Sequence, residues 1–229
     1  MAKDPPKLPT TRGETALDAS AIAAGFTPVV GGAVSAVLSG ISQARKFNRV
    51  AGILQDLADE LAGFRSEVMD EYVKTEDFED LLEQTLRRAA EERSDEVRTL
   101  YRNFLYRAIT APGDEYDEQL GVLRAVERIR APHLTVLRAL SQPPSPEAHR
   151  KMMGSPIQTL RERTGLGDDE IKRTVAILNE MKATNLSALS VMMTGHGSES
   201  LQSSVTNLGR KVLEYTADNE NLDGDEPRA

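Results

Sequence analysis

Residues able to perform acid–base, nucleophilic or metal chemistry are few and scattered in this sequence. The three histidines are His133, His149 and His196, and none has a second histidine or a carboxylate at the spacing of a metal site. The chain contains no cysteine, and its acidic pairs, such as Glu91-Glu92 and Asp114-Glu115, lie in charged runs typical of solvated surfaces. No phosphate-binding glycine loop, nucleophile elbow or H-E-x-x-H motif occurs. We therefore predict no catalytic residue, no metal site and no cofactor.

Basic side chains that could bind a partner gather in the C-terminal third of the chain. Lys172, Arg173 and Lys182 are expected on the outward face of one helix, and His196 stands between two glycines in an exposed turn. Lysine and arginine at such positions can contact DNA phosphates or a guanine edge. The acidic run 168–170 would repel the DNA backbone at the helix end that leads into the groove. We therefore favour a protein partner and keep DNA as the alternative.

Composition and charge set further limits. The chain of 229 residues has a net charge of −8, which argues against a basic surface for nucleic acid or acidic membrane over the whole molecule. Tryptophan is absent and the aromatic fraction is 4 %, so the core must rest on aliphatic side chains. Residues 1–13 are polar and proline-rich and lack the pattern of a signal peptide. We expect a disordered N-terminal arm and a cytoplasmic protein.

The clearest helical pattern is a seam of apolar residues whose spacings alternate between three and four, as in a heptad repeat. Its members are Phe47, Val50, Leu54, Leu57, Leu61, Phe64 and Val68. Charged residues fill the positions between them and form a solvated face. Since more amphipathic helices follow, we favour packing of this seam within the chain over an intermolecular coiled coil, and homo-oligomer formation stays open.

Helix-start signals mark the elements that follow. Thr75 and Ser94 each precede two acidic residues, as N-caps do, and Pro132 suits the first turn of a later helix. No strand pattern occurs before residue 186. The run SQPPSPE contains three prolines that cannot continue a helix, which predicts a linker or a rigid corner at residues 141–146.

After the proline-rich segment the pattern changes to short elements. Ser155 and Pro156 begin one predicted helix, and Asp168 with Asp169 caps another. The stretches LSALSVMMT and LQSSVT flank the turn GHGSES, which predicts a β-hairpin with a glycine-rich tip. Thr206 is expected to cap a last helix, NLGRKVLEY.

This order of elements resembles that of winged helix-turn-helix domains over about residues 155–216. The last segment, VTNLGRKVLEYT, is similar to the "LTxxGrxllexi" close of many bacterial winged-helix regulators. The resemblance implies that Thr206 caps the last helix, that Gly209 permits close packing behind the wing, and that the helix with Lys172 and Arg173 would enter a DNA major groove. Winged helices bind proteins as well as DNA, so the resemblance leaves the partner open.

The segment AIAAGFTPVVGGAVSAVLSGISQ, residues 21–43, carries no charge and has two interpretations. The segment contains a helix-starting proline, Pro28, and small residues at helical spacing: Gly31, Gly32, Ser35, Ala36, Ser39 and Gly40. Such small residues would let helices approach closely, in a core or in lipid. The composition gives it weak membrane affinity. We favour two packed core helices and keep conditional membrane insertion open, because glycine-rich helices at the front of a bundle resemble HeLo-like cell-death domains.

The middle of the chain resembles a second bacterial group. The stretches TEDFEDLLEQTLRRAAEERSDEVRTLYRNFLYRAI and PHLTVLRAL are similar to poorly characterised helical proteins that include the abortive-infection alpha family. The resemblance covers about residues 28–140. It implies an all-helical domain and a phage-defence context, and it carries over no catalytic residue.

These patterns predict a mainly α protein with a multi-helix bundle at residues 14–140 and a small winged-helix (α+β) module at 147–216. An acidic disordered tail is expected at 217–229. We expect a non-enzymatic stress or phage-defence effector or sensor that acts through protein or membrane contacts, with membrane association only on activation. A DNA-binding transcriptional regulator with a helical dimerisation domain is the alternative.

Overall fold

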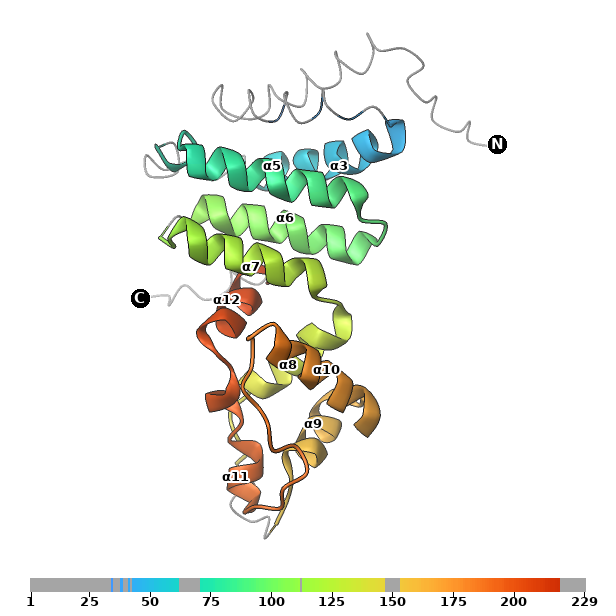
Figure 1. The fold of residues 1–229 in the computed structure, drawn as a ribbon, viewed down its shortest axis with the longest axis vertical. Coiled ribbons are helices and arrows are strands. Elements are labelled where there is room, and N and C mark those ends of the chain that lie inside the picture. The colour runs from blue at the N-terminus through green and yellow to red at the C-terminus, as the bar shows by residue number, and fades with distance from the viewer. Residues whose placement is uncertain are drawn as a thin grey trace, which may run out of the picture. The chain divides into compact units, whose positions relative to one another are not determined.

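The computed structural model describes residues 34, 38, 41, 43–61, 71–111, 113–146 and 153–218 (Figure 1). These residues are mainly helical, which confirms the predicted mainly α class. Among them, β-structure is limited to two isolated antiparallel bridges. The chain separates into two compact units, Met1–Leu123 and Arg124–Ala229, which are described in turn.

In the first unit, long helices pack side by side: α3 (Ala44–Leu61), α5 (Glu76–Glu91) and α6 (Asp95–Thr110) (Figure 1). Helix α3 contacts both α5 and α6, and these two contact each other. The predicted seam is buried at Phe47, Val50, Leu54 and Leu57. The seam thus packs within the chain, as predicted, while its last members, residues 64 and 68, lie outside the described residues.

Local capping starts the helices of this unit where the sequence predicts. The Thr75 hydroxyl accepts a hydrogen bond from the backbone N–H of Phe78 at 3.3 Å, and Ser94 accepts one from Val97 at 3.4 Å. Helix α7 (Tyr116–Arg128) begins in this unit. The amide nitrogen of Gln84 on α5 lies 3.3 Å from the Tyr116 hydroxyl, so the first turn of α7 is tied to α5.

The second unit is built around α8 (Ala131–Ser141), which contacts α9 (Pro156–Thr164), α10 (Asp168–Glu180) and α12 (Asn207–Tyr215). Val136, Leu137 and Leu140 of α8 are fully buried. The contacts therefore divide the chain between Leu123 and Arg124, ahead of α8, whereas the sequence places α8 in a bundle ending at residue 140. The difference arises because the apolar face of α8 packs on helices that come later in the chain.

The proline-rich segment 141–146 forms a corner held by side chains from later elements. Arg163 of α9 donates hydrogen bonds to the carbonyl oxygens of Ala139 at 2.7 Å, Gln142 at 3.3 Å and Pro143 at 3.1 Å. The backbone N–H of Ser145 donates to a carboxylate oxygen of Glu199 at 2.8 Å. These contacts fit the rigid-corner interpretation of the prolines.

The predicted β-hairpin with a GHGSES tip is wrong. Residues Gly195–Glu199 form a short helix, α11, whose N-cap Thr194 accepts a hydrogen bond from the N–H of Gly197 at 3.2 Å. A 3₁₀ turn, η2 (Gln202–Ser204), follows. The two bridges instead pair Gly154 with Met193 and Thr184 with Val205. A threonine cap and burial of Glu199 stabilise a helix here, in spite of the two glycines.

Most of the uncharged segment 21–43 lies outside the described residues, together with the expected arm 1–13, residues 219–229 and His149. The small-residue positions Pro28, Gly31, Gly32, Ser35, Ala36, Ser39 and Gly40 are among those outside. Within the segment, Val34 and Leu38 are helical and buried. None of the helices among the described residues has both the length and the apolar composition that a membrane crossing needs.

Candidate functional site

The basic residues singled out in the sequence all have exposed side chains. Lys172 and Arg173 lie on α10, and Lys182 follows this helix with a left-handed backbone conformation, φ 61°. Lys172 forms an ion pair with Asp169 at 3.7 Å. His196 is exposed too, but it belongs to α11 rather than to a hairpin tip. The predicted set is therefore divided between two elements.

The start of α10 is strongly acidic. Its N-cap is Gly167, so the prediction that Asp168 and Asp169 cap the helix is corrected: with Glu170 they occupy the first turn. Carboxylates there stabilise the positive end of the helix dipole. Asp168 also lies 3.3 Å from the guanidinium of Arg161 on α9. This end of α10 thus presents negative charge beside Lys172.

A tight junction joins the end of α10 to the start of α12, as the "LTxxG" resemblance implies. The Thr206 hydroxyl donates to the carbonyl oxygen of Lys182 at 2.7 Å and accepts from the N–H of Gly209 at 3.1 Å. A Cβ atom at Gly209 would lie 2.1 Å from the carbonyl oxygen of Ala183. The roles predicted for Thr206 and Gly209, capping and close packing, are both confirmed.

The large apolar side chains that are exposed among the described residues fall at one place in the fold. They are Met153, Val191 and Met192, exposed by 58 %, 54 % and 53 %, and we call them the apolar edge. They flank the bridge in which Gly154 and Met193 exchange two backbone hydrogen bonds of 2.9 Å. The sequence-based prediction assigned Val191 and Met192 to a strand and overlooked Met153. Consecutive apolar residues in the stretches MMG and VMMT were the sequence signal for this cluster.

A largely buried ion pair joins α9 to α11, the short helix that follows the apolar edge in the chain. The Arg163 and Glu199 side chains are only 12 % and 3 % exposed and approach to 3.9 Å. A Cβ atom at Gly154 would lie 2.6 Å from the Ser198 hydroxyl, so α11 packs closely against the backbone at Gly154. Helix α11 is thereby anchored on both sides.

His133 has a structural role at the start of α8. Its Nδ1 atom accepts a hydrogen bond from the backbone N–H of Arg130 at 2.9 Å. Burial lowers the pKa of His133 below its ordinary value of 6.5, and the charges of Arg130 and Arg128 lower it further. Within the described part of the chain, no group of three or more His, Asp or Glu side chains is placed to hold a metal ion.

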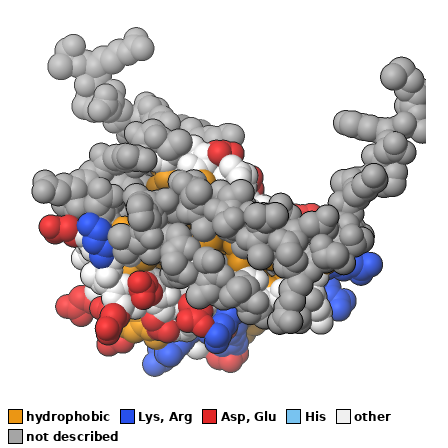
Figure 2. All heavy atoms as spheres, turned by 90° about the horizontal axis from the view of Figure 1, so that it is seen from above, with side chains coloured by type: hydrophobic (Ala, Val, Ile, Leu, Met, Phe, Trp, Pro, Cys, Tyr) orange, Lys and Arg blue, Asp and Glu red, His pale blue; other side chains and the backbone are white. Residues whose placement is uncertain are grey.

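The first unit contains a pocket of about 260 Å³ between α3 and α6. Its charged lining comes from both helices, with Arg49 and Asp56 on α3 and Asp95, Arg98 and Arg102 on α6. Sequence reasoning missed this site because its residues form part of ordinary solvated helix faces until the two helices are brought together. Figure 2 shows acidic and basic side chains intermixed at the margin of the face that it draws.

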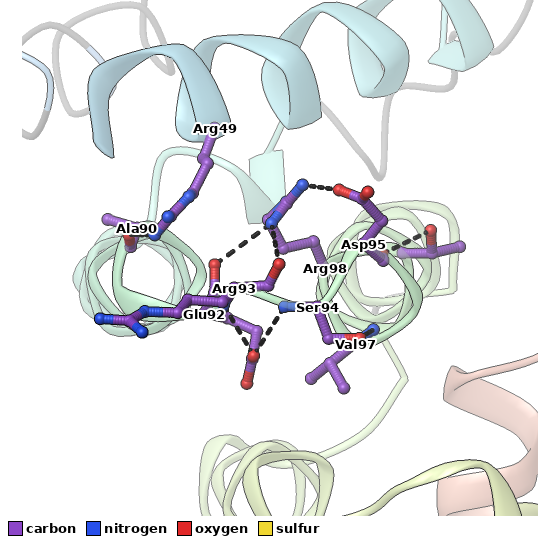
Figure 3. Close-up of polar contacts among 9 residues, drawn as sticks. Arg49, Ala90, Glu92, Arg93, Ser94, Asp95, Val97 and Arg98 are labelled. Carbon is purple, nitrogen blue, oxygen red and sulfur yellow. Dashed lines mark hydrogen bonds and ion pairs between the residues drawn. The ribbon is translucent and has the colours of Figure 1, made fainter. Parts of the chain in front are cut away.

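One wall of this pocket is fixed by the corner between α5 and α6 (Figure 3). The Glu92 carboxylate accepts from the N–H groups of Arg93 and Ser94 at 2.7 and 2.9 Å. Arg98 donates to the carbonyl oxygens of Glu92 and Arg93 at 3.2 and 3.1 Å and forms an ion pair with Asp95. The guanidinium of Arg98 is therefore held in one orientation.

Comparison with protein-family models, with curated proteins and with solved structures gives no match.

Proposed function

We propose that the chain is a non-enzymatic binding protein whose C-terminal unit contacts a protein partner through the apolar edge. The observation that carries this proposal is the clustering of Met153, Val191 and Met192 around one backbone bridge, each more than half exposed. Exposed apolar side chains gathered at one place are typical of protein contact sites, and methionine adapts well to a partner surface.

The order of elements supports a winged-helix-like architecture for this unit. Helices α8, α9 and α10 correspond to the three-helix part of such a domain. The bridges Gly154–Met193 and Thr184–Val205 fall between the helices, where wing strands would pair. The junction at Thr206 and Gly209 fits the close of the motif. The wing itself is reduced in this proposal, and α11 stands in its place.

Charge favours protein over DNA as the partner. A winged helix reads DNA through its second motif helix, here α10, and affinity depends on neutralised phosphates. The first turn of α10 holds three carboxylates, and the Lys172 ammonium is paired with one of them, Asp169. A role in stress response or phage defence is the context that the resemblance to the abortive-infection alpha family implies, with the helical first unit as the effector part.

Affinity capture from the source cells, combined with DNA gel shifts, tests this proposal. The Met153→Ser/Met192→Ser double variant should lose a partner that wild type retains, because the apolar contact area is removed. Ser203→Ala, which changes an exposed polar residue of the same unit, is the matched control. A DNA shift that weakens in Lys172→Ala/Arg173→Ala, with partner capture unchanged in the methionine variant, would instead establish the transcriptional-regulator alternative.

A further inference from the structure

We infer that the pocket between α3 and α6 binds a small molecule that carries an oxyanion group, phosphate or carboxylate, together with hydrogen-bond donors. The site lies wholly in the first unit and is independent of the proposed protein contact. Four features of the described residues support it: the matched helix faces, the fixed guanidinium groups, the open space at Gly52 and the distribution of charge.

The two helices present matched faces across the pocket. Its lining on α3 is Asn48, Arg49, Gly52, Ile53 and Asp56, and on α6 it is Asp95, Arg98, Thr99 and Arg102. Spacings of three, four and seven place such residues on one side of a helix. Polar side chains on two facing stripes therefore converge on one volume, where each helix alone offers only a solvated face.

Two of the arginines are held in place and partly withdrawn from water. The Arg98 side chain is 19 % exposed and is fixed by two carbonyl oxygens and Asp95. The Arg102 side chain is 23 % exposed, pairs with Glu60 at 3.2 Å and donates to the Asn103 side chain at 3.1 Å. Guanidinium groups that are already oriented lose little entropy when they bind an oxyanion.

Arg49 supplies donors from the opposite helix. Its Nη1 atom donates to the Ala90 carbonyl oxygen at 3.0 Å, so the side chain points toward the last turn of α5 (Figure 3). No other hydrogen bond or ion pair joins Arg49 to a described residue. Because a guanidinium has five N–H groups in a planar fork, Arg49 retains donors for a ligand oxyanion.

Gly52 leaves space in the pocket. It lies in the middle of α3, where glycine weakens a helix relative to alanine. A Cβ atom there would meet nothing within 4 Å, so packing does not require a glycine. Gly52 lines the pocket and is exposed, so a larger side chain at this position would project into this open space.

The carboxylates narrow the class of ligand. Asp95 is paired with Arg98, whereas Asp56 is exposed and has no partner among the described residues. The lining holds three arginines and two aspartates, and Glu60, which pairs with Arg102 at 3.2 Å, adds a third carboxylate beside it, so the charges balance. Asp56 would repel a bare anion and would accept hydrogen bonds from hydroxyl or amino groups, so the lining fits a ligand with both an oxyanion and donors.

An amide NMR titration of the full chain with sodium phosphate, and separately with sodium acetate, at constant ionic strength tests the inference. Arg49→Gln should weaken binding by about tenfold, because it removes a charged fork from the oxyanion. Arg45→Gln makes the same charge change at an exposed position of α3 outside the pocket and should leave affinity within about twofold. Asp56→Asn should strengthen binding by about threefold.

Gly52→Leu is the steric test, since it should abolish binding while the protein remains folded by its amide spectrum. Phosphate binding with this pattern of variants identifies a phosphate ligand, and acetate binding with the same pattern identifies a carboxylate ligand. The inference is overturned if neither anion shifts the amides of Gly52 and Thr99. Equal weakening by Arg49→Gln and Arg45→Gln, or full affinity in Gly52→Leu, would overturn it as well.

Discussion

At the scale of single residues, Gly209 is the described glycine at which an added methyl group would come closest to a neighbouring atom. A methyl group there would meet the Ala183 carbonyl oxygen at 2.1 Å and Val205 at 3.0 Å. Gly209→Ala should therefore lower the free energy of unfolding by about 1–3 kcal/mol, the range expected for overpacking. Urea denaturation measures the change.

The control for that substitution is Gly121→Ala in α7. A Cβ atom at Gly121 meets nothing within 4 Å, and alanine is the better helix former. The control should leave stability unchanged or raise it by up to about 1 kcal/mol. Equal shifts of the urea midpoint in the two variants would contradict close packing of Gly209 against Ala183.

His133 makes the stability of the second unit depend on pH. Its folded-state pKa is lowered, so the unfolded chain takes up a proton first as the pH falls. The associated stability is fully present above the ordinary pKa of 6.5 and is lost as the pH falls through the folded value. Thermal unfolding between pH 7 and 5, about the range in which histidine titrates, should show this loss.

His133→Gln removes the titration and keeps the hydrogen bond. The same chain contains the precedent, because the Gln158 side chain accepts from the backbone N–H of Ser155 at 3.2 Å. The variant should lose less stability than wild type on acidification, while His196 and His149 are common to both proteins. Parallel pH profiles would contradict a role for His133 in acid sensitivity.

At the scale of elements, the capped helices were predictable because each cap is a local contact. Thr75, Ser94 and Thr206 each accept from a backbone N–H three residues later, so sequence spacing alone identifies them. The α11 segment was not predictable in the same way. The glycines of GHGSES favour a turn, and the burial of Glu199 depends on Arg163, which lies 36 residues away. The α3–α6 pocket was missed for the same reason, since it exists only once the helices pack.

The Arg163–Glu199 pair therefore has a testable effect on α11 and the proline-rich corner. Arg163→Ala removes donors to Ala139, Gln142 and Pro143 and leaves the Glu199 carboxylate buried. Removing one partner of a buried pair costs about 3–5 kcal/mol. Arg161→Ala, on the same helix, breaks the exposed pair with Asp168 and should cost no more than about 1 kcal/mol. Equal losses in chemical denaturation would mean that Arg163 is no anchor.

At the scale of the whole molecule, the assignment of α8 changes where the protein can be divided. The prolines at 141–146 are the most conspicuous break in the sequence, yet the contacts place the division before α8. Prolines end a helix for local reasons, whereas a unit boundary depends on which apolar faces meet. The face of α8 that carries Val136, Leu137 and Leu140 is buried against elements after the prolines.

This boundary predicts how two fragments of the chain behave. A fragment of residues 124–229 contains α8 with α9, α10 and α12, so it should fold alone and give a cooperative thermal transition by circular dichroism. A fragment of residues 147–229 lacks the fully buried side chains of α8 and has fewer than 90 residues. A chain of this size buries too little apolar surface to fold stably once a core helix is missing. It should show helical signal without a cooperative transition and without dispersed amide resonances. Cooperative unfolding of the shorter fragment would restore the proline-rich segment as the boundary and return α8 to the first unit.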